Sequence, residues 1–227
     1  MDSNTEDKTV NNDSGGLLSI GHWFYIAIIS IVTNWVIIGV LQLRPNEHLA
    51  IYPHHLTFSA LIFYSFAQPV AKLLGFNLFV LLITMLFLHK KVHSGYFILA
   101  MIMGALVGGL AIWGFEDNYH YYVGLSNIVY GTIGFTIGWR RVTRFKVVLL
   151  IIIIGLNFIL WAHNLQEQTW WNHSKSVFTA IGHTGALLGG IMASGFAELV
   201  EEEEKKASQS IKEPLNPQNR EVNAKTD

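Results

Sequence analysis

The chain has 227 residues, of which 51% are hydrophobic and only 14% are charged. The charged share lies well below the roughly 25% of a soluble domain. The apolar residues come in long runs separated by short polar breaks, which indicates a membrane protein with several spans. A formal net charge of −1 gives no reason to expect a nucleic-acid partner. The absence of cysteine excludes disulfides, thiol catalysis and thiolate metal sites.

Both ends of the sequence are polar. Residues 1–20 start acidic and rich in asparagine and serine, which predicts a disordered N-terminal tail. Because this start is not basic, we expect the first apolar run to remain as a membrane anchor and not to be removed as a signal peptide. Residues 201–227 open with four glutamates and two lysines and predict a second disordered tail. The membrane domain is therefore expected over residues 21–200.

Six apolar runs inside this domain predict an all-α bundle of six transmembrane helices. A further segment, residues 51–69, is interrupted by Pro53, Gln68 and Pro69, and is expected to form a helical loop in the membrane interface. The fourth run is short for a hydrocarbon core of roughly 30 Å. The predicted spans are residues 23–43, 70–88, 95–115, 125–139, 147–163 and 177–199.

Basic residues between the spans predict the orientation of the bundle. Six of them follow the second and fourth spans, against two in the loops on the other side. Basic loops stay in the cytoplasm, so both termini are expected to be cytoplasmic. The six are Lys90, Lys91, Arg140, Arg141, Arg144 and Lys146, and the two are Arg44 and Lys175.

Three spans that run from outside to inside each carry a polar residue in their outer part. Ser126 opens the fourth span, His183 lies about 9 Å along the sixth, and Asn77 is seven residues into the second. An ionisable side chain inside a membrane is costly and is a functional candidate by default. Taken singly, the serine and the asparagine are better explained by helix packing, and the histidine is open between a buried contact and a function. Their common depth favours a shared site.

The chemistry of this set is acyl transfer. A serine becomes a nucleophile when a neighbouring base takes its proton, and neutral histidine is the usual base near pH 7. A backbone N–H and the Asn77 amide can hold the oxyanion of the tetrahedral intermediate. Tyr130 lies one helical turn after Ser126 and is expected to pack against the His183 ring. The predicted spans contain no aspartate, so a serine–histidine dyad is expected in place of a triad.

The sequence resembles the rhomboid family of intramembrane serine proteases over roughly residues 20–200. The resemblance implies Ser126 and His183 as catalytic residues, with Asn77, Tyr130 and Asn127 as the oxyanion and support positions. Gly124, Gly185 and Gly190 are expected at helix-packing positions, where the glycines of the sixth span meet the fourth. The matching motifs are Phe76-Asn77-Leu78, Ser94-Gly95, Gly124-Leu125-Ser126 with Tyr130, and His183 followed by Ala186 and Gly190.

The run from Tyr121 to Ser126 and the compact six-span length are similar to the rhombosortase branch of this family. That branch implies a membrane-anchored protein substrate with a C-terminal glycine–glycine sorting tail, cut near the outer face of the lipid bilayer. It also implies a multi-pass protein of a bacterial inner (plasma) membrane that needs no cofactor. The histidines match no zinc-ligand spacing, so no metal is expected.

Two positions depart from the family pattern and keep other functions open. Asn127 stands where the family has glycine after the nucleophile, and Leu73 stands where it has a histidine that supports the oxyanion. These departures favour the alternative of an inactive rhomboid-like protein that binds transmembrane segments. A small transporter that uses His183 and Asn77 is a further alternative, although the inverted repeat of such proteins is not visible in the sequence.

Overall fold

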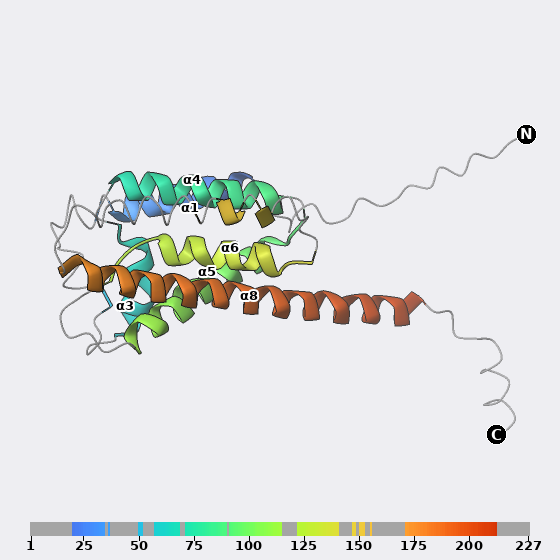
Figure 1. The fold of residues 1–227 in the computed structure, drawn as a ribbon. Helices are drawn as coiled ribbons and strands as arrows, with labels where there is room; N and C mark the ends of the chain where they lie inside the picture. The colour runs from blue at the N-terminus through green and yellow to red at the C-terminus, as the bar shows by residue number, and fades with distance from the viewer. Residues whose placement is uncertain are drawn as a thin grey trace, which may run out of the picture.

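A computed structural model of the chain (Figure 1) shows a helical protein. The structure describes residues 20–34, 36, 50–51, 57–68, 71–89, 91–114, 122–140, 147–148, 150–152, 155 and 171–212. Within these residues there is no strand, which confirms the all-α class. The elements are α1 (Ile20–Asn34), α3 (Phe58–Phe63), the 3-10 helix η2 (Tyr64–Phe66), α4 (Ala71–Leu88), α5 (Ser94–Trp113), α6 (Ser126–Gly138) and α8 (Trp171–Lys212).

Two of these helices are long and apolar enough to cross a membrane. They are α5, with a mean hydropathy of 2.1, and the Thr179–Ser210 part of α8, with a mean hydropathy of 1.2. Helices α1 and α4 contain shorter apolar stretches, Gly21–Val32 and Leu73–Leu88. The structure therefore supports a helical membrane protein. Six spans and cytoplasmic termini remain predictions, and most of the predicted fifth span, residues 147–163, lies outside the described residues.

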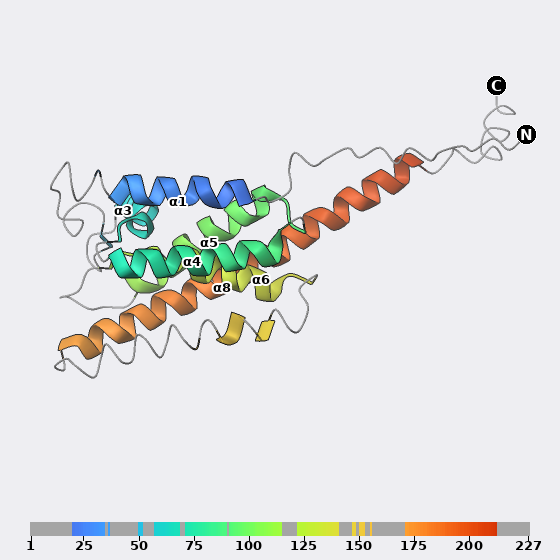
Figure 2. The same ribbon diagram turned by 90° about the horizontal axis from the view of Figure 1, so that it is seen from above.

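Helix α6 is the centre of the bundle. It contacts α4 on one side and α5 and α8 on the other, and its residues 127–136 are all buried. Figures 1 and 2 show α8 running obliquely past α5 and α6, with its last turns extending beyond the other helices. The predicted span of residues 125–139 agrees with α6 to within one residue at each end. A short helix can be this buried because longer neighbours surround it.

Glycines bring α8 into contact with α6. A Cβ atom on Gly134 would collide with the Leu187 carbonyl of α8, and one on Gly190 would collide with the Gly131 carbonyl of α6. Small residues let membrane helices approach until their backbones touch. Gly190 thus lies against the fourth predicted span, as expected.

Gly185 and Gly189 of α8 meet a different helix. A Cβ atom on Gly185 would lie 2.7 Å from the Ala111 side chain of α5, and one on Gly189 would collide with the Met103 carbonyl, also of α5. The sequence predicts that the glycines of the sixth span contact the fourth, and for Gly185 and Gly189 this prediction is wrong. Glycines 185 and 190 are five residues apart, which places them about 140° apart around the helix. The glycines of α8 therefore allow close packing against both α5 and α6.

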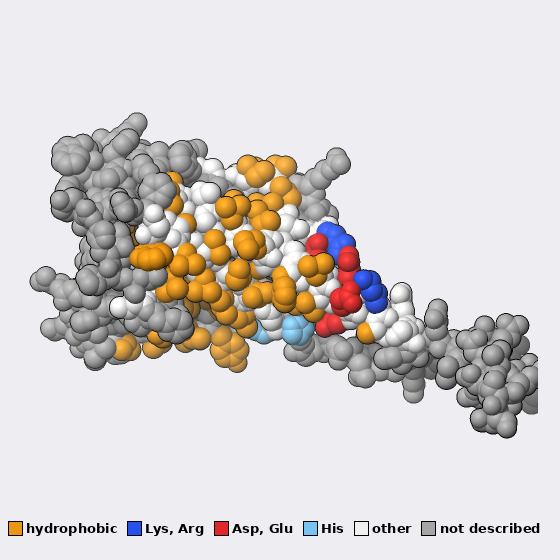
Figure 3. Space-filling model, turned by 90° about the horizontal axis from the view of Figure 1, so that it is seen from below, with side chains coloured by type: hydrophobic (Ala, Val, Ile, Leu, Met, Phe, Trp, Pro, Cys, Tyr) orange, Lys and Arg blue, Asp and Glu red, His pale blue; other side chains and the backbone are white. Residues whose placement is uncertain are grey.

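Helix α8 continues to Lys212. Residues 201–212, which were predicted to be part of a disordered tail, are therefore helical. The added turns carry ion pairs at helical spacing. The Lys206 ammonium lies 2.7 Å from the Glu203 carboxylate one turn earlier, and Arg140 after α6 pairs with Glu198 and Glu202. Figure 3 shows these acidic and basic side chains gathered at one end of the apolar surface. Charge content alone had suggested disorder, but the spacing of these charges suits a solvated helix.

The segment between α1 and α4 is partly helical, as predicted. The Thr57 side chain caps α3 by accepting the Ala60 N–H at 3.1 Å. After it, η2 buries Tyr64 completely against Ile112 near the end of α5. An isolated antiparallel bridge joins Ile51 to Tyr122, with N···O distances of 3.0 and 3.1 Å. This segment thus packs on the chain that leads into α6.

Candidate active site

Ser126 is the first residue of α6, and the turn before it is tightly held. The Gly124 N–H donates to the Tyr64 carbonyl at 3.0 Å, and the Leu125 N–H donates to Gln68 Oε1 at 3.1 Å. Gly124 has a φ of +149°, which disfavours a side chain. A Cβ atom there would also lie 3.0 Å from Gln68 Oε1. Gly124 therefore shapes this turn and does not take the helix-packing position expected for it.

Asn77 reaches the start of α6 through Gln68. Its side chain is buried on α4, and Nδ2 donates to Gln68 Oε1 at 3.4 Å. The same oxygen accepts the Leu125 N–H, one residue before Ser126. Leu73, at the position of the missing family histidine, is 47% exposed on α4 and has no polar group to contribute. Asn77, the one side-chain donor that the sequence predicts, thus reaches the turn before Ser126 through Gln68.

Gln68 was treated in the sequence only as a break in an apolar segment. The structure makes it the residue that connects α4 to the beginning of α6. A polar side chain next to a proline, in a segment that is otherwise apolar, was the available signal. Without a partner in view, that signal predicts a turn as readily as a site.

Tyr130 and His183 are stacked face to face. Their ring centroids are 4.0 Å apart and their planes differ by 13°. The His183 Nε2 atom is buried and has no hydrogen-bond partner among the described residues. Buried polar atoms are usually paired, since leaving one unpaired costs about 1–3 kcal/mol. An oriented imidazole with an unused nitrogen is what a general base requires.

The Ser126 hydroxyl is bonded to a different residue. Its Oγ lies 2.9 Å from the Tyr122 hydroxyl, and no hydrogen bond joins it to His183 in the described part of the chain. Catalytic hydrogen bonds are often long or misaligned before a substrate binds, so this geometry does not exclude the pair. The structure thus orients the histidine through Tyr130, while Tyr122 holds the serine.

Asn127 is the hub of a buried hydrogen-bond network around this serine. Its Oδ1 accepts from the Tyr122 hydroxyl at 3.2 Å, and its Nδ2 donates to the Tyr64 hydroxyl at 2.7 Å. The Tyr64 hydroxyl in turn donates to the Ala105 carbonyl of α5 at 2.6 Å. Asn127 and Tyr64 are fully buried. The residue that departs from the family pattern thus ties α6 to η2 and α5.

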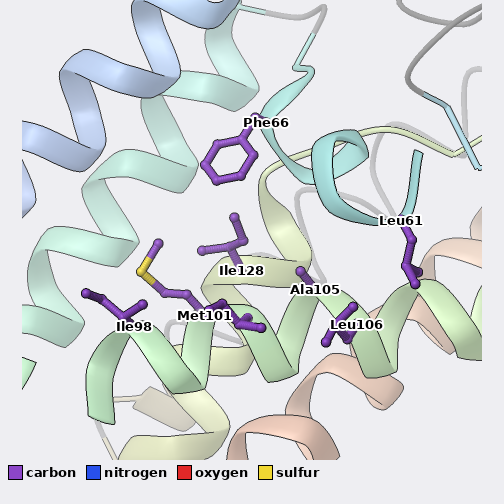
Figure 4. Close-up of a pocket in the computed structure, with 8 residues that line it drawn as sticks. Leu61, Phe66, Ile98, Met101, Ala105, Leu106 and Ile128 are labelled. Atoms are coloured by element: carbon purple, nitrogen blue, oxygen red, sulfur yellow. The ribbon is translucent and has the colours of Figure 1, made fainter. Parts of the chain in front are cut away.

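An apolar pocket of about 180 Å³ lies on another side of α6 (Figure 4). Ile128 contributes from α6, and because it is two residues after Ser126 it points about 160° away from the serine. All of the side chains that line the pocket are apolar. Its lining is Leu61 and Phe66 from α3 and η2, Ile128 from α6, and Ile98, Met101, Ile102, Ala105 and Leu106 from α5.

Metal-ligating side chains do not gather in the described residues. No group of three histidine, aspartate or glutamate side chains is close enough there to hold an ion. The arrangement around Ser126 therefore offers hydroxyl, amide and imidazole groups.

Comparison with known proteins gives no match of any kind. No family model matches the chain, and no curated protein or solved structure is similar enough to match it. The resemblance to rhomboid proteases accordingly rests on the sequence motifs alone.

Proposed function

We propose that this protein is an intramembrane serine endopeptidase of the rhomboid type. The observation that carries the proposal is the stacked Tyr130–His183 pair, whose buried Nε2 atom has no partner among the described residues. The pair joins α8 to the helix that opens with Ser126. Other buried atoms among the described residues, such as Ser65 Oγ and His89 Nδ1, also have no partner, so the stacking of His183 on the Ser126 helix is what favours catalysis over packing.

In the proposed reaction, Ser126 Oγ attacks the scissile carbonyl and gives its proton to His183 Nε2. The tetrahedral oxyanion is held by the Ser126 N–H and the Asn77 amide. His183 then passes the proton to the leaving amine, and a water molecule repeats the sequence to release the acyl group. Two local changes are needed first: Ser126 must turn from Tyr122 toward His183, and Asn77 must exchange its 3.4 Å bond to Gln68 for the oxyanion.

The proposed substrate is a membrane-anchored protein cut near the outer face, with a rhombosortase-like C-terminal sorting tail as the specific form. The proposal includes six spans, cytoplasmic termini and a bacterial inner membrane. Support comes from the two ends of α6: Ser126 opens the helix among neutral residues, whereas Arg140 follows it among charged ones. Charged groups belong outside the hydrocarbon core, and the positive-inside rule assigns the Arg140 end to the cytoplasm.

A second candidate is an inactive rhomboid-like protein that binds transmembrane segments. It is favoured by the Tyr122–Ser126 hydrogen bond, which holds the serine without the histidine. Leu73 and Asn127 also favour the inactive candidate, because each replaces a residue that rhomboid proteases use at their active site. The two candidates differ in one property, the reactivity of Ser126.

Labelling with a fluorophosphonate probe tests this property. The probe is added to the purified full-length protein in detergent, alongside Ser126→Ala and His183→Ala. Ser94→Ala and Thr184→Ala are matched controls, because Ser94 also opens a helix and Thr184 is the exposed neighbour of His183. We expect labelling of the wild type and of both controls, and its loss in the two site variants. Folded wild type that labels no better than Ser126→Ala would establish the inactive candidate.

A further inference from the structure

The hydrogen bonds around Asn127 can run in only one direction. The Ala105 carbonyl only accepts, so the single proton of the Tyr64 hydroxyl goes to it. The Tyr64 oxygen must then accept from Asn127, which turns the Nδ2 group toward Tyr64 and Oδ1 toward Tyr122. The orientation of the amide therefore follows from its partners.

The same reasoning fixes the proton of Ser126. Asn127 Oδ1 can only accept a hydrogen bond, so the Tyr122 hydroxyl donates its single proton to that oxygen, at 3.2 Å. In the 2.9 Å contact between Tyr122 and Ser126, the serine is then the donor. The proton that a nucleophilic serine gives to its base is thus directed at Tyr122.

Packing keeps this arrangement in place. Asn127 and Tyr64 are fully buried and Tyr122 is 9% exposed, so water does not compete strongly for these groups. The Asn127 amide lies against Gly108 of α5, where a Cβ atom would collide with Nδ2, and close to Gly182 of α8. The amide is therefore enclosed by both helices.

We propose that Tyr122, oriented by Asn127, is a positioning residue that restrains Ser126 by holding its proton away from His183. The inference rests on the proposed protease function. Binding of a substrate must turn Ser126 out of this hydrogen bond before His183 can take the proton. Asn127, which stands where the family has glycine, sets the direction of the restraint and makes the resting enzyme slow.

Rates of fluorophosphonate labelling test the restraint. In this reaction the Ser126 oxygen bonds to phosphorus, fluoride leaves and His183 takes the proton. Tyr122→Phe removes the acceptor of the serine proton, and Asn127→Ala frees the Tyr122 proton to point at Ser126 instead. Each variant should label about fivefold faster, since one hydrogen bond contributes about 1 kcal/mol. Both should also unfold at a lower temperature, because buried partners are lost.

Thr132→Val is the matched control for a general loosening of α6. Its hydroxyl is buried on the same helix and donates only to the Val129 carbonyl, at 2.8 Å. This variant should be less stable and label at the wild-type rate. If Tyr122 had only a structural role, Tyr122→Phe would lower the melting temperature without raising the labelling rate. A lower melting temperature together with faster labelling is therefore specific to the restraint.

A double-mutant cycle in thermal unfolding checks the hydrogen bond independently of activity. The losses from Tyr122→Phe and Ser126→Ala should be less than additive if the two hydroxyls are bonded. Additive losses, or a wild type that labels at least as fast as Tyr122→Phe and Asn127→Ala, would overturn the inference and leave the protease proposal standing. If no version labels, the protease proposal fails and the inference fails with it.

Discussion

The two ends of α6 are held in opposite ways. At the Ser126 end, neutral groups on Tyr64, Tyr122 and Asn127 form hydrogen bonds inside the bundle. At the other end, Arg140 makes ion pairs with Glu198 and Glu202 of α8, at 2.8 Å each. The Arg140 side chain is 59% exposed, whereas Asn127 is fully buried. The hydrogen bonds at the Ser126 end orient buried polar groups, and the ion pairs at the Arg140 end join α8 to the chain after α6 in an exposed position.

Exposed ion pairs and buried hydrogen bonds contribute to the structure in different ways. An exposed ion pair gains little, because water and salt screen it. A buried neutral network also gains little net energy, but breaking it leaves unpaired groups and so fixes the position of each partner. The hydrogen bonds at the Ser126 end therefore fix the positions of Tyr64, Tyr122 and Asn127. The Arg140 end needs only to keep α8 beside α6.

The largest expected effect comes from a change at the close contact of α6 and α8, which lies between the two ends. Gly190→Ala places a Cβ atom against the Gly131 carbonyl and should lower stability by about 1–3 kcal/mol. Gly195→Ala is the control on the same helix, since nothing lies within 4 Å of its Cβ. It should be neutral or stabilising by up to about 1 kcal/mol. Equal melting temperatures for the two variants would contradict the close packing.

The next effect concerns only the Ser126 end. Tyr130→Ala removes the ring stacked on His183, so the imidazole is no longer oriented and labelling by the fluorophosphonate probe should slow about fivefold. That value corresponds to about 1 kcal/mol for an aromatic pair. Tyr130→Phe keeps the ring and should label at nearly the wild-type rate. An equal loss in both variants would show that the hydroxyl, and not the stack, supports the site.

A smaller effect is expected at the Arg140 end. Arg140→Ala removes both ion pairs to α8, so the backbone amides after Glu198 should exchange hydrogen faster while probe labelling stays unchanged. Lys206→Ala is the control, because its pair with Glu203 lies within α8 and does not reach α6. Hydrogen exchange followed by mass spectrometry reads both variants. A fall in labelling by Arg140→Ala would show that the two ends are coupled.

The smallest effect is a dependence on pH. The Arg140 guanidinium, hydrogen-bonded to the Glu202 carboxylate, holds the pKa of that carboxyl below its ordinary value. The stabilisation is therefore complete above the ordinary value of about 4.3 and is lost as the pH falls through the lowered pKa. Amides after Glu198 should exchange faster in acid, beyond the intrinsic effect of pH, and this excess should be absent in Arg140→Ala. An equal excess in both proteins would assign the change to other carboxylates.

The sequence predicts the bounds of α6, with Ser126 at its start, for a physical reason. An apolar run that begins after a glycine turn and ends at Trp139 and Arg140 gives clear helix boundaries. The stack of Tyr130 on His183 followed from helical spacing, because a residue four positions after Ser126 lies on the same face. These features depend on local pattern, which one sequence contains.

The partners of Leu125 and Asn127, the two residues that flank the serine, could not be predicted from local pattern. Tyr64 and Gln68 lie about sixty residues before α6 in an interrupted segment, and only the folded chain brings them to Asn127 and Leu125. From the sequence, Asn127 is only a departure from the family pattern, because its role depends also on Tyr64, which lies 63 residues earlier. The helical extension to Lys212 was missed because Arg140, which pairs with Glu202 in the extension, follows α6 and lies far away in the chain.

The most direct test of this account is to locate the fluorophosphonate adduct by tandem mass spectrometry in the wild type and in Arg140→Ala. If the Ser126 end carries the chemistry and the Arg140 end only anchors α8, both proteins should carry the adduct on Ser126, and His183→Ala should carry none. An adduct on another residue, or a folded wild type without any adduct, would contradict the assignment of Ser126 and His183 as the catalytic pair.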